Sequence, residues 1–219
     1  MCTLHYLENS RSHRILWMLE ELGAQYKLEV YRRDKRTNLA PASMKAIHPL
    51  GKSPVLTDGD VTVAESGAIV EYLAERCEGM HMMPTEGEDG RQCRYWLHFA
   101  EGSLMAPLVT RYVFSVAGNK VPFFLRPVLM FVPNAIEKAY LSQTIKGNLD
   151  FVESHLTGRE FFVGDALSVA DVMMIFPLEA ATGRTKDVGP NTRAYVKRIQ
   201  ARPAYQAALK AAGLPYVYA

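Results

Sequence analysis

The feature that most constrains the fold is a change in hydrophobic periodicity along the 219-residue chain. In residues 1–78, short alternating segments typical of strands are interleaved with segments that carry apolar residues at helical spacing. After residues 79–90, which are rich in glycine, proline and acid, only helical spacing remains. We therefore expect a first domain at 1–78, a linker at 79–90 and a second domain at 91–219.

The first domain is predicted to be a small mixed sheet with helices packed on it. Strands are expected at residues 2–7 and 27–31, with a helix at 13–23 between them that ends at Gly23. Asp58-Gly59 separates two further strands and is a strong hairpin signal. A last helix follows in SGAIVEYLAERC. This order favours an α/β layer.

The second domain is predicted to be all-helical. Ser168 precedes an apolar run and is followed three residues later by Asp171, which resembles a capping box. Glycine and proline divide the domain into helices at residues 91–110, 135–156, 168–182 and 190–212.

Residues 121–133, VPFFLRPVLMFVP, are apolar except for Arg126. The segment is too short to span a bilayer as a helix, and its three prolines would interrupt one. The favoured interpretation is an irregular buried segment. The alternatives are the wall of an apolar pocket and a surface that touches lipid.

Composition excludes several classes of function. The net charge of +2 and the lack of a basic stripe argue against a nucleic-acid-binding protein. Cys2, Cys77 and Cys93 are odd in number and lack metal-ligand spacing, which favours a reducing compartment such as the cytoplasm. The N-terminus has no features of a signal peptide.

Three segments of the first domain carry candidate binding residues. Ser10, Arg11 and Ser12 lie between a strand end and a helix start, where the serines could cap the helix or an anion could bind. Lys52-Ser53-Pro54 combines a cation with an X-Pro bond, at which a cis peptide costs little. Glu65-Ser66 lies at a second helix start. Together these segments would suit a short peptide with two carboxylates and one amine.

Four segments give the chain a family resemblance: SRSHRILWMLEELG, HPLGKSPVLTDGD, ESGAIVEYL and FFVGDALSVADV. In their order and spacing the chain resembles a cytosolic glutathione transferase of the serine-type, bacterial and fungal-like branch. The resemblance implies a thioredoxin-like first domain, an all-helical second domain, a homodimer, glutathione as co-substrate and no metal. It also implies binding roles for six residues: Glu65 and Ser66 for the γ-glutamyl end, Ser53 before a cis Pro54 for the cysteinyl backbone, and Lys52 with His48 for the glycyl carboxylate.

The same resemblance implies that a serine of the first loop donates a hydrogen bond to the glutathione thiolate. Ser10 is the first candidate, Ser12 is the second, and Arg11 would add to the effect if it points inward. Lowering a thiol pKa of about 8.5 by two units needs roughly 2.7 kcal/mol. One hydrogen bond to a charged group supplies about 1.5–3 kcal/mol, and a helix N-terminus adds roughly 0.3–1 kcal/mol.

An electrophile pocket is expected between the domains. Glu101 is expected to reach the glutathione amine of the partner subunit, as an acidic residue does in relatives. The candidates to line the pocket, each of which could instead be ordinary core, are Met105, Tyr112, Phe114, Phe123 and Phe124.

These features predict an enzyme that adds glutathione to hydrophobic electrophiles, as in detoxification. Two alternatives stay open. The first is another glutathione-dependent reaction, such as peroxide or disulfide reduction, dehalogenation or ether cleavage. The second is a non-catalytic glutathione-binding protein.

Overall fold

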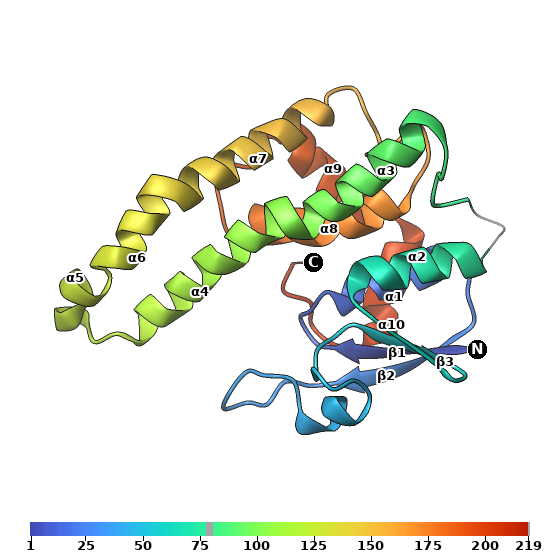
Figure 1. Cartoon of the computed structure of the whole chain (residues 1–219), viewed down its shortest axis with the longest axis horizontal. Coiled ribbons are helices and arrows are strands. Elements are labelled where there is room, and N and C mark those ends of the chain that lie inside the picture. The colour runs from blue at the N-terminus through green and yellow to red at the C-terminus, as the bar shows by residue number, and fades with distance from the viewer. Residues whose placement is uncertain (78–80, 219) are drawn as a thin grey trace.

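The computed structural model describes residues 1–77 and 81–218, and its first domain contains a four-stranded sheet in the order β2-β1-β3-β4 (Figure 1). β1 pairs in parallel with β2 and antiparallel with β3, which pairs antiparallel with β4. The elements are β1 (Cys2–Leu7), α1 (Ser12–Glu21), β2 (Tyr26–Tyr31), the 3-10 turn η1 (Ala42–Ala46), β3 (Val55–Asp58), β4 (Val61–Ala64) and α2 (Ser66–Arg76). This is the predicted thioredoxin-like arrangement.

Local sequence explains the boundaries of these elements. Gly23 ends the turn after α1 at a φ of 57°, and Gly59 closes the β3–β4 hairpin at a φ of 59°. Both angles lie in the left-handed region that favours glycine. Leu4 and Tyr6 of β1 are buried, so the central strand is covered on the side that α1 packs against.

The second domain is helical, as predicted. α8 forms its centre and is buried along nearly its whole length. The elements are α3 (Gly87–Phe99), the π-helical segment η2 (Ala100–Met105), α4 (Ala106–Lys120), the 3-10 turn η3 (Phe123–Leu125), α5 (Arg126–Leu129), α6 (Phe131–Ile136), the π-helical segment η4 (Glu137–Leu141), α7 (Ser142–His155), α8 (Val169–Thr182), α9 (Pro190–Gln200) and α10 (Pro203–Ala212).

The beginning of α3 lies within the predicted linker at residues 79–90. Residues 79 and 80 of that stretch lie outside the described residues, and α3 begins at Gly87. Glu88 and Asp89, which made this stretch look like linker, occupy the first turn of α3. Acidic side chains at that position stabilise a helix through its dipole.

The interpretation of residues 121–133 as a buried irregular segment was wrong. The chain here folds into η3, α5 and the start of α6, and none of the residues in these three helices is buried. Pro127 and Pro133 lie near the beginnings of α5 and α6, where a missing N–H costs little. The prolines therefore divide the segment into short helices and do not unfold it.

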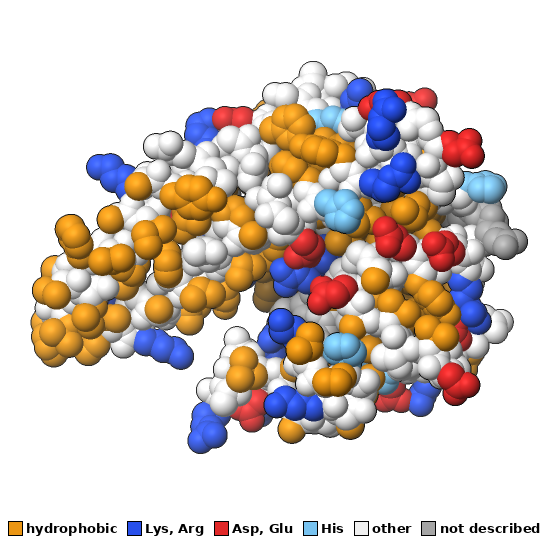
Figure 2. All heavy atoms as spheres, in the orientation of Figure 1, with side chains coloured by type: hydrophobic (Ala, Val, Ile, Leu, Met, Phe, Trp, Pro, Cys, Tyr) orange, Lys and Arg blue, Asp and Glu red, His pale blue; other side chains and the backbone are white. Residues whose placement is uncertain are grey.

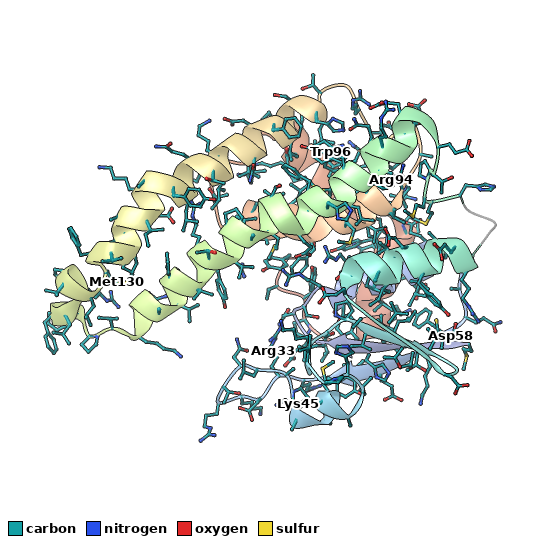
Figure 3. All side chains as sticks on the ribbon, viewed as in Figure 1. Arg33, Lys45, Asp58, Arg94, Trp96 and Met130 are labelled. Carbon is teal, nitrogen blue, oxygen red and sulfur yellow. The ribbon has the colours of Figure 1, made fainter. Side chains whose placement is uncertain are left out.

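α4 and the run from α6 to α7 form a long helical hairpin that extends beyond the first domain (Figure 1). Figure 3 shows the two ends of this structure: Trp96 lies on α3 near the core, and Met130 lies at the far end of the hairpin. Trp96 is fully buried and stacks on Phe151 of α7 at a centroid distance of 5.3 Å. In the part of the chain that the structure describes, no helix has the length and apolarity needed to cross a membrane.

Candidate functional site

A hollow of about 260 Å³ lies where the two domains meet, and the binding residues predicted in the first domain line it. Figure 2 shows basic and acidic side chains side by side in this region. Three segments of the first domain and one residue of η2 form the walls. The lining residues are Arg11, His48, Leu50, Lys52, Ser53, Pro54, Ala64, Glu65, Ser66, Gly67 and Glu101.

The start of α2 is the most distinctive wall of the hollow. Ser66 is only 4% exposed, and its Oγ has no hydrogen-bond partner among the described residues. Glu65 precedes it at a φ of 73°, an uncommon conformation for a residue with a side chain. A buried hydroxyl without a partner costs free energy, and the first N–H groups of a helix attract anions. This corner is therefore suited to a carboxylate.

The Ser53–Pro54 peptide bond is cis, as predicted from the resemblance. The Ser53 hydroxyl points into the sheet, where it donates to His5 O at 3.1 Å and accepts from Leu7 N–H at 3.2 Å. The backbone N–H and C=O of Ser53 have no hydrogen-bond partner within residues 1–77 and 81–218. Both groups are therefore available to pair with an extended ligand.

Ser10 and Ser12 are both used inside the protein. Ser10 Oγ donates to Leu7 O at 2.7 Å and accepts from the N–H of Ser12, the first residue of α1, at 3.1 Å. Ser12 is fully buried, and its Oγ is hydrogen-bonded to Ser53 Oγ. Neither serine lines the hollow. Of the two interpretations of this loop, the geometry supports the cap, and thiolate activation stays a prediction.

Arg11 lies between these serines and does line the hollow. Its Nε and Nη2 donate to the Glu101 carboxylate at 2.9–3.0 Å in a bidentate pair. Arg14 Nη2 contacts Oε1 of the same carboxylate at 2.5 Å, and Arg14 also donates to Met173 O at 2.8 Å. One carboxylate thus joins Arg11, which precedes α1, and Arg14 of α1 to the second domain.

This cluster sets the charge of the domain junction. Burial alone would raise the pKa of Glu101. The charge of Arg14 and the hydrogen bonds from Arg11 outweigh this effect and lower the pKa to about 2. Both guanidinium groups also lie over the Phe176 ring, at 5.4 and 5.6 Å from its centroid. Because the carboxylate stays ionised near neutral pH, Arg11 is held at the rim of the hollow.

Arg14 was not predicted to belong to the site. It follows Arg11, the N-cap of α1, by three residues, so both side chains lie on one side of the start of α1, and Arg14 is only 1% exposed. A fully buried arginine on a predicted helix demands an acidic partner, but that partner lies far along the sequence. The carboxylate of Glu101, expected to reach a partner subunit, is engaged by these two arginines of its own chain.

The residues predicted to line one electrophile pocket are dispersed. Met105 is buried against Phe176 and Ala180, and Tyr112 lies under the Arg184 guanidinium at 4.3 Å. Phe124 is exposed. The structure therefore does not bring these five candidates together in one pocket, because the length of the α4 hairpin carries several of them away from the domain junction.

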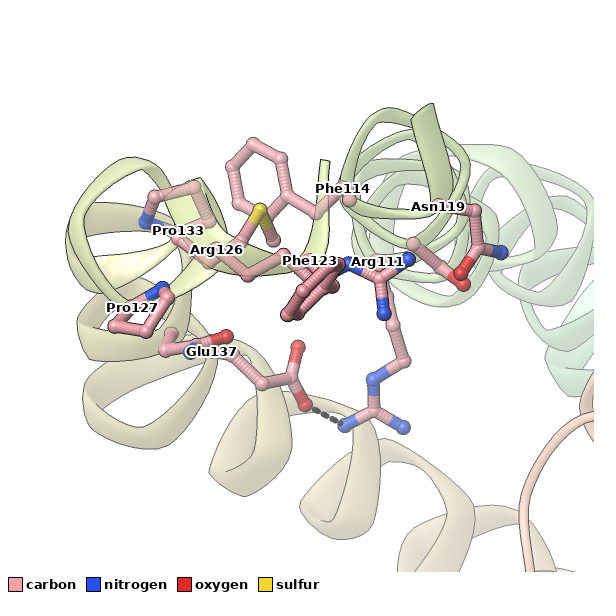
Figure 4. A pocket seen from close by; sticks show the side chains of 12 residues that line it. Arg111, Phe114, Asn119, Phe123, Arg126, Pro127, Pro133 and Glu137 are labelled. Atoms are coloured by element: carbon pink, nitrogen blue, oxygen red, sulfur yellow. Dashed lines mark ion pairs between the residues drawn. The ribbon is translucent and has the colours of Figure 1, made fainter. Parts of the chain in front are cut away.

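Phe114 and Phe123 instead line a separate cavity of about 550 Å³ near the end of the hairpin (Figure 4). Arg111 and Glu137 also line this cavity, and Arg111 Nη2 forms an ion pair with the Glu137 carboxylate at 2.7 Å. This cavity is lined by residues of α4, η3, α5, α6 and η4, and none of its lining residues belongs to the first domain.

Each of the two domains matches a protein-family model. Residues 1–75 match the model of the glutathione S-transferase N-terminal domain, and residues 106–203 match that of the C-terminal domain. Glutathione S-transferase 3 of Schizosaccharomyces pombe is 38% identical over 208 residues, covering 93% of this chain and 85% of the relative. Glutathione S-transferase 1 of Saccharomyces cerevisiae is 34% identical over 216 residues, covering 93% and 92%.

Solved structures show the same similarity. A glutathione S-transferase from Actinobacillus pleuropneumoniae superposes with a TM-score of 0.81 at 31% identity, covering 100% of this chain and 95% of that one. A sphingomonad glutathione S-transferase in complex with glutathione gives a TM-score of 0.73 at 26% identity, covering 97% and 100%.

Proposed function

Because the chain belongs to the glutathione S-transferase family of enzymes, we propose that the hollow binds glutathione and activates its thiol for attack on hydrophobic electrophiles. The thiolate sulfur forms a bond to an electrophilic carbon, and the displaced group leaves with its electron pair or a proton adds to the neighbouring carbon. Sequence similarity supports the family, and the polar lining of the hollow supports the binding of a short peptide with two carboxylates.

Each part of the tripeptide has a counterpart in the hollow. The γ-glutamyl carboxylate fits the N-terminus of α2 at Ser66, and Glu65 can accept from the amine. The cysteinyl backbone fits the unpaired N–H and C=O of Ser53. Lys52, with His48 beside it, supplies a cation for the glycyl carboxylate. In this proposed order the sulfur would lie toward the start of α1 and Arg11.

The buried, unpartnered hydroxyl of Ser66 carries this proposal. Ser66→Ala removes no hydrogen bond of the free protein, so we expect its thermal midpoint to stay unchanged. Glutathione affinity, measured by isothermal titration calorimetry, should fall at least tenfold, because a hydrogen bond to a charged group contributes about 1.5–3 kcal/mol. Ser43→Ala, at an exposed serine of η1 outside the hollow, is the matched control. Equal affinities for Ser66→Ala and the control would place glutathione elsewhere.

Ser10 is proposed as the donor to the thiolate, which requires its hydroxyl to turn away from Leu7 O. The exchange gives up a neutral hydrogen bond, worth about 0.5–1.5 kcal/mol, for one to a charged sulfur, worth about 1.5–3 kcal/mol. The net gain of about 1 kcal/mol is smaller than the roughly 2.7 kcal/mol needed for a shift of two pKa units. The start of α1 and Arg11 at the rim of the hollow would supply the rest.

The proposed reaction is conjugation. The alternative reactions, peroxide or disulfide reduction, dehalogenation and ether cleavage, use the same thiolate with other acceptors. Steady-state turnover with an aromatic halide, an organic peroxide and a mixed disulfide distinguishes them. Binding of glutathione without turnover of any acceptor would favour the non-catalytic alternative. We also propose a homodimer, which sedimentation velocity tests directly against the mass of one chain.

A further inference from the structure

The far end of the helical hairpin, residues 121–136, presents an unusual apolar surface, called here the tip. No residue in η3, α5 or α6 is buried, although most of them are apolar. Phe123 is 81% exposed, and hydrophobic side chains cover this end of the molecule in Figure 2. The other strongly exposed apolar residues of the tip are Phe124, Val128, Leu129, Phe131 and Val132. An exposed patch of this kind marks an interaction site.

The charged side chains at the tip that lack an ion-pair partner among the described residues are basic. The sequence contains no aspartate or glutamate between Glu101 and Glu137. Arg111 is paired with Glu137, but Lys120 and Arg126 are exposed, and neither forms an ion pair within the described residues. The tip is therefore an apolar surface flanked by two unpaired cations, which complements an anionic surface.

The shape of the tip favours a binding partner that can deform around it over one with a rigid surface. It lies at one end of the long axis of the molecule, away from the rest of the chain (Figures 1 and 3). Its apolar residues come from three short successive helices, and the rings of Phe123 and Phe124 are nearly perpendicular, at 86°. A protrusion of this kind can enter an acyl and headgroup layer, where aromatic and basic side chains are stabilised together.

A second copy of the chain fits the tip less well. In a two-fold contact the same patch meets itself, so Lys120 and Arg126 of both copies would be brought into one interface. No acidic side chain within the tip could balance them. We propose that the tip docks on the surface of a phospholipid bilayer that contains anionic lipids, inserting its aromatic residues at the level of the headgroups.

Vesicle flotation tests this proposal with the full chain. We expect the protein to float with vesicles of phosphatidylcholine containing phosphatidylserine, and at least tenfold less with phosphatidylcholine alone. Binding should weaken as salt is raised, because the electrostatic part is screened. Lack of binding to both vesicles at low salt would overturn the proposal.

Two pairs of variants separate the apolar and charged contributions. Phe124→Ser with Phe131→Ser should lower the bound fraction at least tenfold, whereas Leu39→Ser with Val217→Ser, at equally exposed sites elsewhere, should leave it unchanged. Lys120→Gln with Arg126→Gln should remove the preference for phosphatidylserine. Its control is Lys35→Gln with Arg36→Gln, at exposed cations of the first domain. Equal losses in the variants and their controls would overturn the assignment to the tip.

Fluorescence supplies a direct reading of insertion. Both tryptophans of the chain, Trp17 and Trp96, are fully buried, so they form a constant background. Phe124→Trp should show a blue-shifted emission on addition of anionic vesicles and quenching by lipids brominated along the acyl chain. If Phe124→Trp shifts in the absence of vesicles as protein concentration rises, and does not respond to lipid, a second copy covers the tip and the proposal fails.

Discussion

Glu101 is the residue on which the junction between the domains most depends. It balances Arg14, which is only 1% exposed, and it holds Arg11 at the rim of the hollow. Removing the acid from such a cluster leaves a buried cation without a counter-charge, which costs several kcal/mol.

Glu101→Gln is therefore expected to lower the free energy of unfolding by about 3 kcal/mol in urea denaturation. Arg14→Met combined with Glu101→Gln should recover part of this loss, because the uncompensated buried charge is then gone. Glu75→Gln, at an exposed acid of α2, is the control and should change stability by less than about 0.5 kcal/mol. A double variant no more stable than Glu101→Gln would contradict this explanation.

His13 makes the fold sensitive to acid. Burial lowers the pKa of His13 to about 4, and neither ring nitrogen has a hydrogen-bond partner among the described residues. Its ring packs against Tyr205 and Tyr216 at centroid distances of 4.9 and 4.2 Å. The folded state thus keeps the neutral imidazole, whereas the unfolded chain takes up a proton below a pH of about 6.5.

The stability that His13 contributes is therefore complete above pH 6.5 and is lost as the pH falls toward 4, by up to roughly 3 kcal/mol. His13→Phe should abolish this loss, as measured by urea unfolding at pH 7 and pH 4.5. Burial raises the pKa of Glu179 to about 7, so its contribution is lost as the pH rises, in the opposite sense. Glu179 is present in both the wild type and His13→Phe. The difference between their changes in unfolding free energy from pH 7 to pH 4.5 therefore reports His13 alone. Parallel profiles would show that His13 is not the group responsible.

Much of the hollow could be predicted at the level of single residues. Glu65 and Ser66 form a strand-to-helix junction and Ser53 precedes the proline before β3, and the geometry of both places follows from local sequence. The pairing of Glu101 with Arg11 and Arg14 could not be predicted, because it joins positions about 90 residues apart through the packing of two domains. The role of the Ser10 hydroxyl could not be predicted either, because a serine before a helix can cap that helix or bind a ligand.

At the level of elements, α8 is held by a capping box that the sequence predicted correctly. Asp171 is fully buried and accepts hydrogen bonds from Phe162 N–H, Ser168 N–H, Ser168 Oγ and Tyr195 OH, all at 2.9–3.0 Å. This one carboxylate therefore fixes the start of the central helix, the preceding loop and α9.

Asp171→Ala should lower the free energy of unfolding by at least about 3 kcal/mol, because several buried donors lose their acceptor together. Tyr195→Phe removes only one of these donors and should cost about 1 kcal/mol. Thermal or urea unfolding followed by circular dichroism compares the two. If the two variants lose similar amounts, Asp171 acts as a simple helix cap and not as a shared acceptor.

Periodicity predicted the helices and strands well, but it could not predict their environment. Residues 121–133 are as apolar as a core segment, and only the length of the hairpin places them in solvent. The single helix expected at 91–110 is in fact α3, η2 and α4. The π-helical segment η2 carries Glu101, and such segments often occur at functional sites.

At the scale of the whole molecule, the two domains form one site. The first domain supplies the polar groups proposed to contact glutathione, and the second supplies Glu101. The fold and the family follow from sequence and structure together. The activation of the thiol is the central proposal, and it depends on the start of α1.

Ultraviolet titration of bound glutathione tests that proposal most directly, because the thiolate absorbs and the thiol does not. In the wild-type protein we expect a thiol pKa about two units below the free value of about 8.5. Ser10→Ala should raise that pKa by roughly one unit, with glutathione binding largely retained, and Ser43→Ala should leave it unchanged. A normal thiol pKa in the wild-type complex would contradict thiolate activation, and a depressed pKa unaffected by Ser10→Ala would show that the backbone of the α1 start, Ser12 or Arg11 stabilises the anion.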